Sequence, residues 1–307
     1  MFQTIAFVTG STGQQGGATA RELLIAGVKV HALVRDPSSK SAMELQRLGA
    51  HLFPGNFDNL SSLTTAMKGA TAVFLNVSPS RPDTHQEVIH AKNIIDAAVS
   101  SGTVTSIVYS SVSMTGKHES FPHWGLEHPM AWYWLNKAQI ESMVRNSGIK
   151  NWTILRPAFL MNNYHQPTAS HMFPDLVQKR VFLTAYNPDS GMTVVDPGDV
   201  GKFAAAAIID PQSFNTHEVD LGVESLTPVQ IVRELSRVSG ANISLQFYSD
   251  QEAKDLALRN PVINAQLWSN EVGYQVDFNK LDKYPINLTR FAEYLKKHRD
   301  EVLQTFN

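Results

Sequence analysis

The chain has 307 residues, of which 43% are hydrophobic and 18% charged, and its formal net charge is −2. This composition indicates a folded protein, and the near-neutral charge offers no basic surface to nucleic acid. Cysteine is absent, which excludes disulfides, thiolate catalysis and zinc–thiolate sites. The longest apolar run, 203–209, is too short to cross a bilayer, and no leader precedes the first predicted strand. We therefore expect a cytoplasmic protein without nucleic-acid or membrane partners.

Strands and helices alternate through the first half of the chain. The patterns predict strands at 4–9, 29–34, 51–53, 72–77, 106–110 and 152–155, and helices at 18–24, 41–48, 60–67 and 84–100. Such alternation is typical of an α/β fold with a doubly wound parallel sheet, as in Rossmann domains.

After residue 157 the pattern becomes irregular. Helices are expected at 200–209, 226–239 and 288–305, whereas 161–175 is predicted to be a long loop. We expect a dinucleotide-binding domain at 1–157, with a later segment, about 181–221, returning to it. Residues 158–307 are expected to form mainly a smaller C-terminal α/β substrate lobe.

A glycine-rich turn with the spacing G-x-x-G-x-x-G joins the first strand to the first helix. It consists of Gly10, Ser11, Thr12, Gly13, Gln14, Gln15 and Gly16. Gly10 allows a sharp turn, Gly13 removes a side chain where a pyrophosphate must approach, and Gly16 allows close packing of helix on sheet. The helix N-terminus then offers N–H groups to phosphates. A tight turn without a ligand is the alternative, but this context favours dinucleotide binding.

The end of the second strand distinguishes the two nicotinamide cofactors. NAD-binding folds place an acid there, whereas this chain has Arg35, nineteen residues after Gly16, with Lys40 following. A guanidinium suits a 2′-phosphate, which favours NADP(H) over NAD. Alternatively, Arg35 is only a solvated surface residue and Asp36 bonds a ribose hydroxyl.

Two further strand ends are predicted to contact the cofactor. Asn56 and Phe57, after the third strand, are expected near the adenine. Asn76 and Val77, at the end of the fourth strand, are expected near the nicotinamide ribose.

Four segments together resemble the NmrA-like family of atypical short-chain dehydrogenases/reductases. They are the turn at 10–16, Ala-Leu-Val-Arg-Asp-Pro at 32–37, Ile-Leu-Arg-Pro-Ala-Phe-Leu-Met-Asn-Asn at 154–163, and Asp-Pro-Gly-Asp-Val-Gly at 196–201. The resemblance spans essentially the whole chain. It implies NADP(H) binding at the turn, at Arg35, near Asn56 and Phe57, and along Phe159, Leu160, Met161 and Asn162. It leaves the reaction open, because the family contains both reductases and redox sensors.

Tyr133 and Lys137 form a Y-x-x-x-K pair on a predicted helix between the fifth and sixth strands. Residues four apart share a helix face, so phenol and ammonium are expected in one site. A free phenol, whose pKa lies near 10, is a poor proton donor or base, and a lysine cation favours the phenolate. In the short-chain superfamily this pair supplies the proton, and the lysine also binds the nicotinamide ribose. The alternative is that Tyr133 packs between Trp132 and Trp134.

The superfamily also places a serine or threonine after the fifth strand to bond the substrate carbonyl. Ser110, Ser111 and Ser113 are candidates, and we select Ser111. His118, His123 and His128 recur every five residues, a spacing that does not align them on a helix, so we predict no metal site.

Aromatic side chains near this region are expected to line a pocket for a planar substrate, together with the three histidines. They are Phe121, Trp124, Trp132, Tyr164 and His165.

The leading hypothesis is an NADPH-dependent reductase of a small cyclic or aromatic carbonyl, enone or imine. In this enzyme, Tyr133 and Lys137 would assist protonation after hydride transfer. The alternative is an NADP(H)-sensing regulator without catalysis, which would have a protein partner. A third possibility is a reductase of the isoflavone-reductase type, in which Lys137 acts alone.

Overall fold

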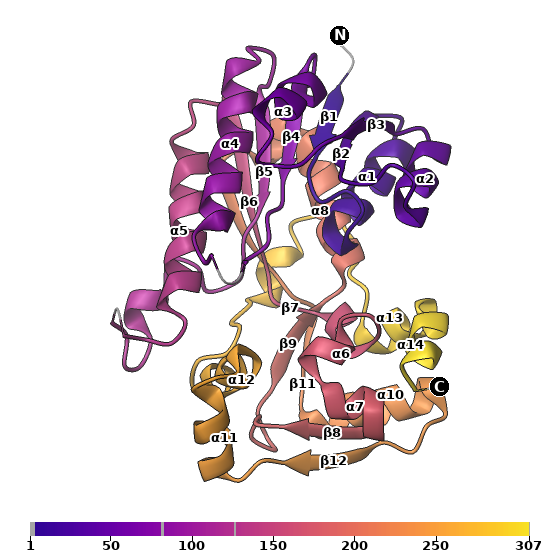
Figure 1. The fold of residues 1–307 in the computed structure, drawn as a ribbon, viewed down its shortest axis with the longest axis vertical. Helices are drawn as coiled ribbons and strands as arrows, with labels where there is room; N and C mark the ends of the chain where they lie inside the picture. The colour runs from indigo at the N-terminus through magenta and orange to yellow at the C-terminus, as the bar shows by residue number, and fades with distance from the viewer. Residues whose placement is uncertain (1–3, 81–82, 126, 307) are drawn as a thin grey trace. The chain divides into compact units, whose positions relative to one another are not determined.

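The computed structural model describes residues 4–80, 83–125 and 127–306, which form two compact units (Figure 1). The first unit contains the chain up to 115, together with 132–156 and 197–219. The second contains 116–131, 157–196 and the chain from 220 onward. Two boundaries differ from the sequence-based division. Residues 116–131 leave the first unit, and 197–219, rather than 181–221, returns to it, because this segment supplies a covering helix and a sheet strand.

A seven-stranded sheet with the order β10-β6-β5-β4-β1-β2-β3 lies at the centre of the first unit. Its strands are β1 (Ile5–Val8), β2 (Lys29–Val34), β3 (His51–Pro54), β4 (Ala72–Leu75), β5 (Ser106–Ser110), β6 (Asn151–Pro157) and β10 (His217–Leu221). β1 pairs in parallel with β2, where Ala6 lies opposite Val30, and with β4, where Ala6 lies opposite Ala72. The order reverses direction beside β1, so the predicted parallel Rossmann sheet is confirmed.

Helices cover both faces of this sheet (Figure 1). They are α1 (Gln14–Ile25), α2 (Lys40–Arg47), α3 (Leu60–Met67), α4 (Gln86–Ser100), α5 (Ala131–Arg145), α8 (Pro197–Ile209) and α9 (Pro211–Phe214). Apolar residues of α3, α4 and α5 join Phe7, Val73 and Ile107 in one buried core. On α1 and α8, Ala18 and Gly201 are so close that a Cβ on Gly201 would lie 2.7 Å from the Ala18 Cβ. β4 and β5 are buried throughout, as expected for strands covered on both faces.

The second unit contains two small sheets, with strand orders β11-β9-β7 and β12-β8. Its strands are β7 (Phe159–Leu160), β8 (Val181–Thr184), β9 (Met192–Val195), β11 (Glu224–Leu226) and β12 (Ser244–Phe247). The α-helices are α6 (Ala169–Met172), α7 (Pro174–Lys179), α10 (Pro228–Ser239), α11 (Asp250–Ala257), α12 (Pro261–Glu271), α13 (Phe291–Lys297) and α14 (Arg299–Phe306). Short 3₁₀ helices span His118–Ser120, Met161–Tyr164 and Phe278–Leu281.

Two sequence-based expectations in the second unit were wrong. Residues 161–175, predicted as a loop, form a 3₁₀ helix and α6, and α7 begins within them, because the buried Tyr164 anchors them by stacking on Phe173 at 5.4 Å. The last predicted helix is divided in two at His298, whose backbone leaves the helical region with φ −104° and ψ 32°. In the part of the chain that the structure describes, no helix has the length and apolar character to cross a bilayer.

Candidate functional site

The glycine turn has the geometry that its spacing predicts. Gly10 has φ +59°, in the left-handed region, and a Cβ on Gly16 would lie 2.3 Å from the Gly10 carbonyl oxygen. No side chain other than glycine fits there without moving the backbone. Gly13 is the N-cap of α1 and has no side chain with which to cap it. The first turn of α1 therefore presents backbone N–H groups that no capping side chain occupies.

Hydrogen bonds fix the turn to three strand ends. The Ser11 hydroxyl donates to the Leu33 carbonyl of β2 at 3.5 Å, and the Ser110 hydroxyl of β5 donates to Gln15 Oε1 at 2.6 Å. Thr9 accepts from the Asn76 N–H at 2.7 Å after β4 and donates to the Phe74 carbonyl at 3.0 Å. Thr12 and Gln14 remain exposed. The turn is thus held at the carboxyl edge of β1, β2, β4 and β5, where open α/β sheets bind ligands.

Arg35 is the first residue beyond β2 and is exposed, as is Lys40 at the start of α2. Within 4–80, 83–125 and 127–306, the structure shows no ion pair to either cation. One oxygen of the Asp36 carboxylate is hydrogen-bonded within its own turn: Oδ1 accepts from the Ser38 N–H at 2.8 Å and from the Ser38 hydroxyl at 2.6 Å. These bonds lower the pKa of Asp36. Arg35 and Asp36 are both exposed at this strand end, and Ser38 bonds only one oxygen of the Asp36 carboxylate, so the role of Arg35 at the cofactor stays a prediction.

The other residues predicted for the cofactor have mixed environments. Asn56 Oδ1 accepts from the N–H groups of Asp58 and Asn59, each at 3.0 Å, so its side-chain oxygen is engaged within its own loop. Phe57 is half-buried against the core, with its ring 5.4 Å from that of His90. Asn76 lies beside Gly10, whose Cβ would be 3.5 Å from Asn76 Nδ2.

Val77 is 3% exposed and belongs to the core, so it offers a ligand its backbone more than its side chain.

Tyr133 and Lys137 lie on one face of α5, as predicted. The Lys137 Nζ is 5.7 Å from the centroid of the Tyr133 ring. Tyr133 is half-buried, and its ring meets that of Trp134 edge-on at 5.2 Å. Lys137 is buried and donates a hydrogen bond to Glu87 Oε1 of α4, forming an ion pair. Sequence reasoning missed Glu87, because no local pattern marks a contact across 50 residues.

The three candidate serines have different partners. Ser110 bonds to Gln15 of the turn, and the buried Ser111 hydroxyl donates to Thr115 Oγ1 at 3.3 Å. The Ser113 hydroxyl is buried without a hydrogen-bond partner among the described residues. Ser111 remains our choice for the substrate carbonyl, and this role stays a prediction.

Phe159, Leu160, Met161 and Asn162 belong to the second unit. The first two form β7, and Met161 is fully buried in the core of that unit. Asn162 donates from Nδ2 to Thr168 Oγ1 at 3.2 Å, whereas its Oδ1 is buried without a partner in the described chain. Their role at the cofactor, implied by the resemblance, stays a prediction.

The aromatic residues predicted for one pocket fall into separate groups. His118 and His128 contact Trp124, with ring centroids 4.7 and 5.3 Å apart. Tyr164 instead packs in the core, and His165 bonds to the Tyr294 hydroxyl at 2.6 Å. Among the described residues, no group of three or more histidines and acids could hold a metal ion.

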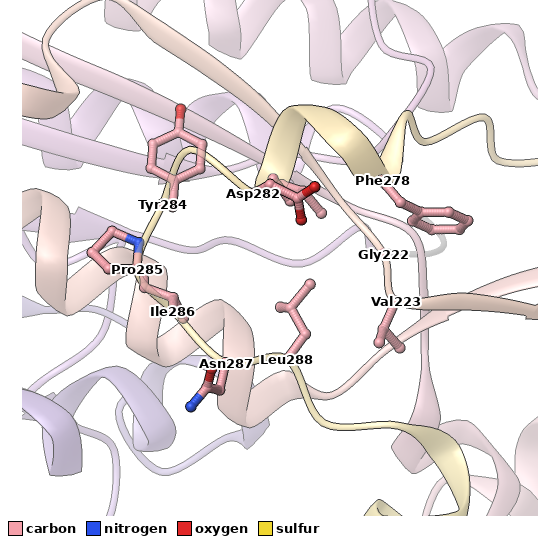
Figure 2. Close-up of a pocket in the computed structure, with 10 residues that line it drawn as sticks. Gly222, Val223, Phe278, Asp282, Tyr284, Pro285, Ile286, Asn287 and Leu288 are labelled. Atoms are coloured by element: carbon pink, nitrogen blue, oxygen red, sulfur yellow. The ribbon is translucent and has the colours of Figure 1, made fainter.

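The second unit contains a pocket of about 420 Å³ that the sequence did not predict (Figure 2). One wall is the segment from Tyr284 to Leu288, and Gly222 and Val223 form another. Asp282 and Asn287 are its exposed polar side chains. The lining includes none of the residues predicted for cofactor or catalysis.

The fold and the turn define a Rossmann-type α/β protein with a phosphate-binding geometry at its sheet edge. The sequence matches the model of the NmrA-like family over residues 1–295, and the chain belongs to that family. An NmrA-like family domain-containing protein of Dictyostelium discoideum is 27% identical over 310 residues, covering 94% of this chain and 96% of the relative.

Two solved structures share the fold. NmrA, a negative transcriptional regulator in complex with NAD, is 21% identical with a TM-score of 0.77, covering 100% of this chain and 99% of NmrA. The NADPH-dependent quinone oxidoreductase QOR2 of Escherichia coli, complexed with NADPH, is 24% identical with a TM-score of 0.74. That match covers 96% of this chain and 99% of QOR2. The fold is thus common to a negative transcriptional regulator and a quinone oxidoreductase.

Proposed function

We propose that the protein is an NADPH-dependent reductase of a small cyclic or aromatic carbonyl, enone or imine. The observation that carries the proposal is the pairing of Tyr133 with Lys137 on α5, with the ammonium 5.7 Å from the ring centroid. A binding module needs no proton donor, whereas a carbonyl reductase needs one beside its hydride source. The similarity in fold to a quinone oxidoreductase supports this class of substrate, because a quinone is a cyclic conjugated dicarbonyl.

The residues of the first unit fit a phosphorylated dinucleotide. The N-terminus of α1 would hold the pyrophosphate, since no side chain of the N-cap Gly13 occupies its first N–H groups. Arg35 would bond the 2′-phosphate, with Lys40 adding positive charge, while Asp36 is held by Ser38. Asn76, next to Gly10, would contact the nicotinamide ribose. Phe159 to Asn162 are proposed as further contacts on the strength of the family resemblance.

When bound, NADPH supplies the hydride. After hydride transfer, Tyr133 donates the proton that the substrate's oxygen, nitrogen or carbon must receive, and Lys137 orients the phenol from the same helix face. Ser111 donates a hydrogen bond to the substrate carbonyl, which stabilises the developing negative charge. The protein therefore protonates and orients the substrate.

The second candidate is an NADP(H)-sensing regulator without catalysis, with another protein as its partner. The observation in its favour is the similarity in fold to NmrA, which is a negative transcriptional regulator. The packing of Tyr133 against Trp134 is consistent with this role, because a packed phenol has a structural reason to be present.

Substrate-dependent oxidation of NADPH distinguishes the two. The protein is mixed with NADPH and a panel of quinones, cyclic enones, aromatic ketones and cyclic imines, and the loss of NADPH absorbance is followed. A reductase oxidises NADPH only when an accepted substrate is present. Binding of NADPH without oxidation on any member of the panel would favour the sensor. If Lys137→Ala abolishes turnover while Tyr133→Phe costs little, the lysine is the only proton-transfer group.

A further inference from the structure

Lys137 is held from the neighbouring helix by a carboxylate that neither the sequence pattern nor the family motifs point to. Glu87 lies in the first turn of α4 and is 0% exposed, and its Oε1 accepts a hydrogen bond from the Lys137 Nζ. The residue before Lys137 makes a second bond to the same region, because Asn136 Nδ2 donates to the Thr84 carbonyl at 2.5 Å. Two adjacent residues of α5, Asn136 and Lys137, are therefore hydrogen-bonded to the chain around the start of α4.

A buried ion pair of this kind is weak evidence of a stabilising role. Removing two charges from water costs free energy that their attraction only partly returns, and apolar residues of similar size often serve as well. Glu87 Oε2 adds to the cost, because it is buried without a hydrogen-bond partner among the described residues. A buried pair that is costly in this way, next to a proton donor, indicates a role in the chemistry.

The geometry determines how the pair acts on Tyr133. The ammonium lies 5.7 Å from the centroid of the Tyr133 ring, and a bare cation there would favour loss of the phenol proton. The carboxylate of Glu87 places a negative charge beside that ammonium. Tyr109 on β5 faces the same group: burial, and next the charge of Glu87, raises the pKa of its phenol, with smaller contributions from Glu141 and Tyr133. The environment around Tyr133 is thus less positive than Lys137 alone would make it.

We propose that Glu87 is a positioning residue for the Tyr133–Lys137 pair. Its carboxylate fixes the ammonium beside the phenol and offsets its charge, so that Tyr133 keeps its proton until the substrate takes it. The inference rests on the proposed function for its catalytic consequence, but its electrostatic content concerns the protein alone and can be tested without cofactor or substrate.

The test is an ultraviolet titration of the Tyr133 phenol, obtained as the difference between each protein and the same protein carrying Tyr133→Phe. In Glu87→Gln the ammonium is uncompensated, and the phenolate signal should appear about one pH unit lower than in the unaltered protein. Glu87→Asp keeps the charge and should restore the original titration. The matched control is Asp199→Asn, which removes another buried carboxylate, 0% exposed and paired with Lys202, from the same unit.

A second variant covers the case in which Glu87→Gln does not fold. In Glu87→Gln/Lys137→Gln both charges are removed. If the carboxylate offsets the ammonium, the Tyr133 phenol should titrate at nearly the same pH as in the unaltered protein. A titration at clearly higher pH in the double variant would show that the lysine charge acts unopposed, and would overturn the proposal. The proposal would also be overturned if the phenol of folded Glu87→Gln titrated at the same pH as that of Asp199→Asn.

Turnover provides the separate catalytic readout. In Glu87→Gln the high-pH limb of kcat should move down by the same amount as the phenol titration, with NADPH binding retained. If the phenol titration shifts in Glu87→Gln but the high-pH limb of kcat does not, the catalytic part of the proposal is contradicted. If the unaltered protein reduces no substrate, the proposed function fails, while the titration still decides whether Glu87 controls the phenol.

Discussion

A Cβ on Gly16 would lie 2.3 Å from the carbonyl oxygen of Gly10, within the turn that joins β1 to α1. This contact sets how closely the start of the helix approaches the strand end. The approach directs the first N–H groups of α1 toward the position where a pyrophosphate would sit.

Gly16→Ala should therefore disrupt both the fold and ligand binding. The overlap must be relieved by moving the backbone, which we expect to cost about 1–3 kcal/mol or more of the free energy of unfolding. NADPH binding should weaken together with stability. Chemical denaturation and cofactor fluorescence measure the two effects. The control is Gly125→Ala, where a Cβ would meet no described atom within 4 Å, and an equal loss in both variants would contradict this explanation.

Arg35→Glu tests the preference for NADP(H). Replacing the exposed guanidinium by a carboxylate should weaken NADPH binding by roughly 10–100-fold, because charge-assisted bonds to the 2′-phosphate are lost and repulsion replaces them. Binding of NADH should change little. The control is Arg47→Glu, an identical charge change at the exposed end of α2. Equal weakening of NADPH and NADH binding in Arg35→Glu would contradict the role at the 2′-phosphate.

We expect the buried His165 to make the stability of the fold depend on pH. Burial lowers its pKa, and its ring bonds to the Tyr294 hydroxyl and the Gln166 carbonyl, at 2.6 and 2.8 Å. The unfolded chain therefore binds a proton more readily than the folded one, so stability is intact above the usual histidine range and falls as pH drops below about 6.5.

The expected slope is up to about 1.4 kcal/mol per pH unit for this one proton. His165→Gln should reduce the slope of unfolding free energy against pH, measured by urea denaturation. His171→Gln, at an exposed histidine in the same unit, should leave the slope as it was. His31 and His128, whose pKa values burial also lowers, add to the slope in the same direction. A slope unchanged in His165→Gln would refute this assignment.

Local signals account for what the sequence could predict. The first unit was predicted well because a glycine turn, strand–helix alternation and i,i+4 spacing are local features. The pairing of Tyr133 with Lys137 follows from helix geometry alone. The Glu87 contact could not be predicted in this way, because it depends on how α4 packs against α5. The anchoring of Gln15 by Ser110 is likewise a contact across 95 residues.

The second unit was harder to predict for a related reason. Its short strands and the helices between 161 and 179 are stabilised by packing, with Tyr164 against Phe173 and Phe291, rather than by a strong period in the sequence. Likewise, nothing local indicated that His298 would divide the last helix, since its neighbours are good helix formers.

The most direct measurement of the central claim is the rate of NADPH oxidation, at saturating NADPH and an accepted carbonyl substrate, for the unaltered protein and for Tyr133→Phe. If Tyr133 donates the proton, kcat should fall by about 10²–10⁴-fold while NADPH binding is retained. An equal kcat in the two proteins would contradict the account, since it would leave Tyr133 with a packing role only.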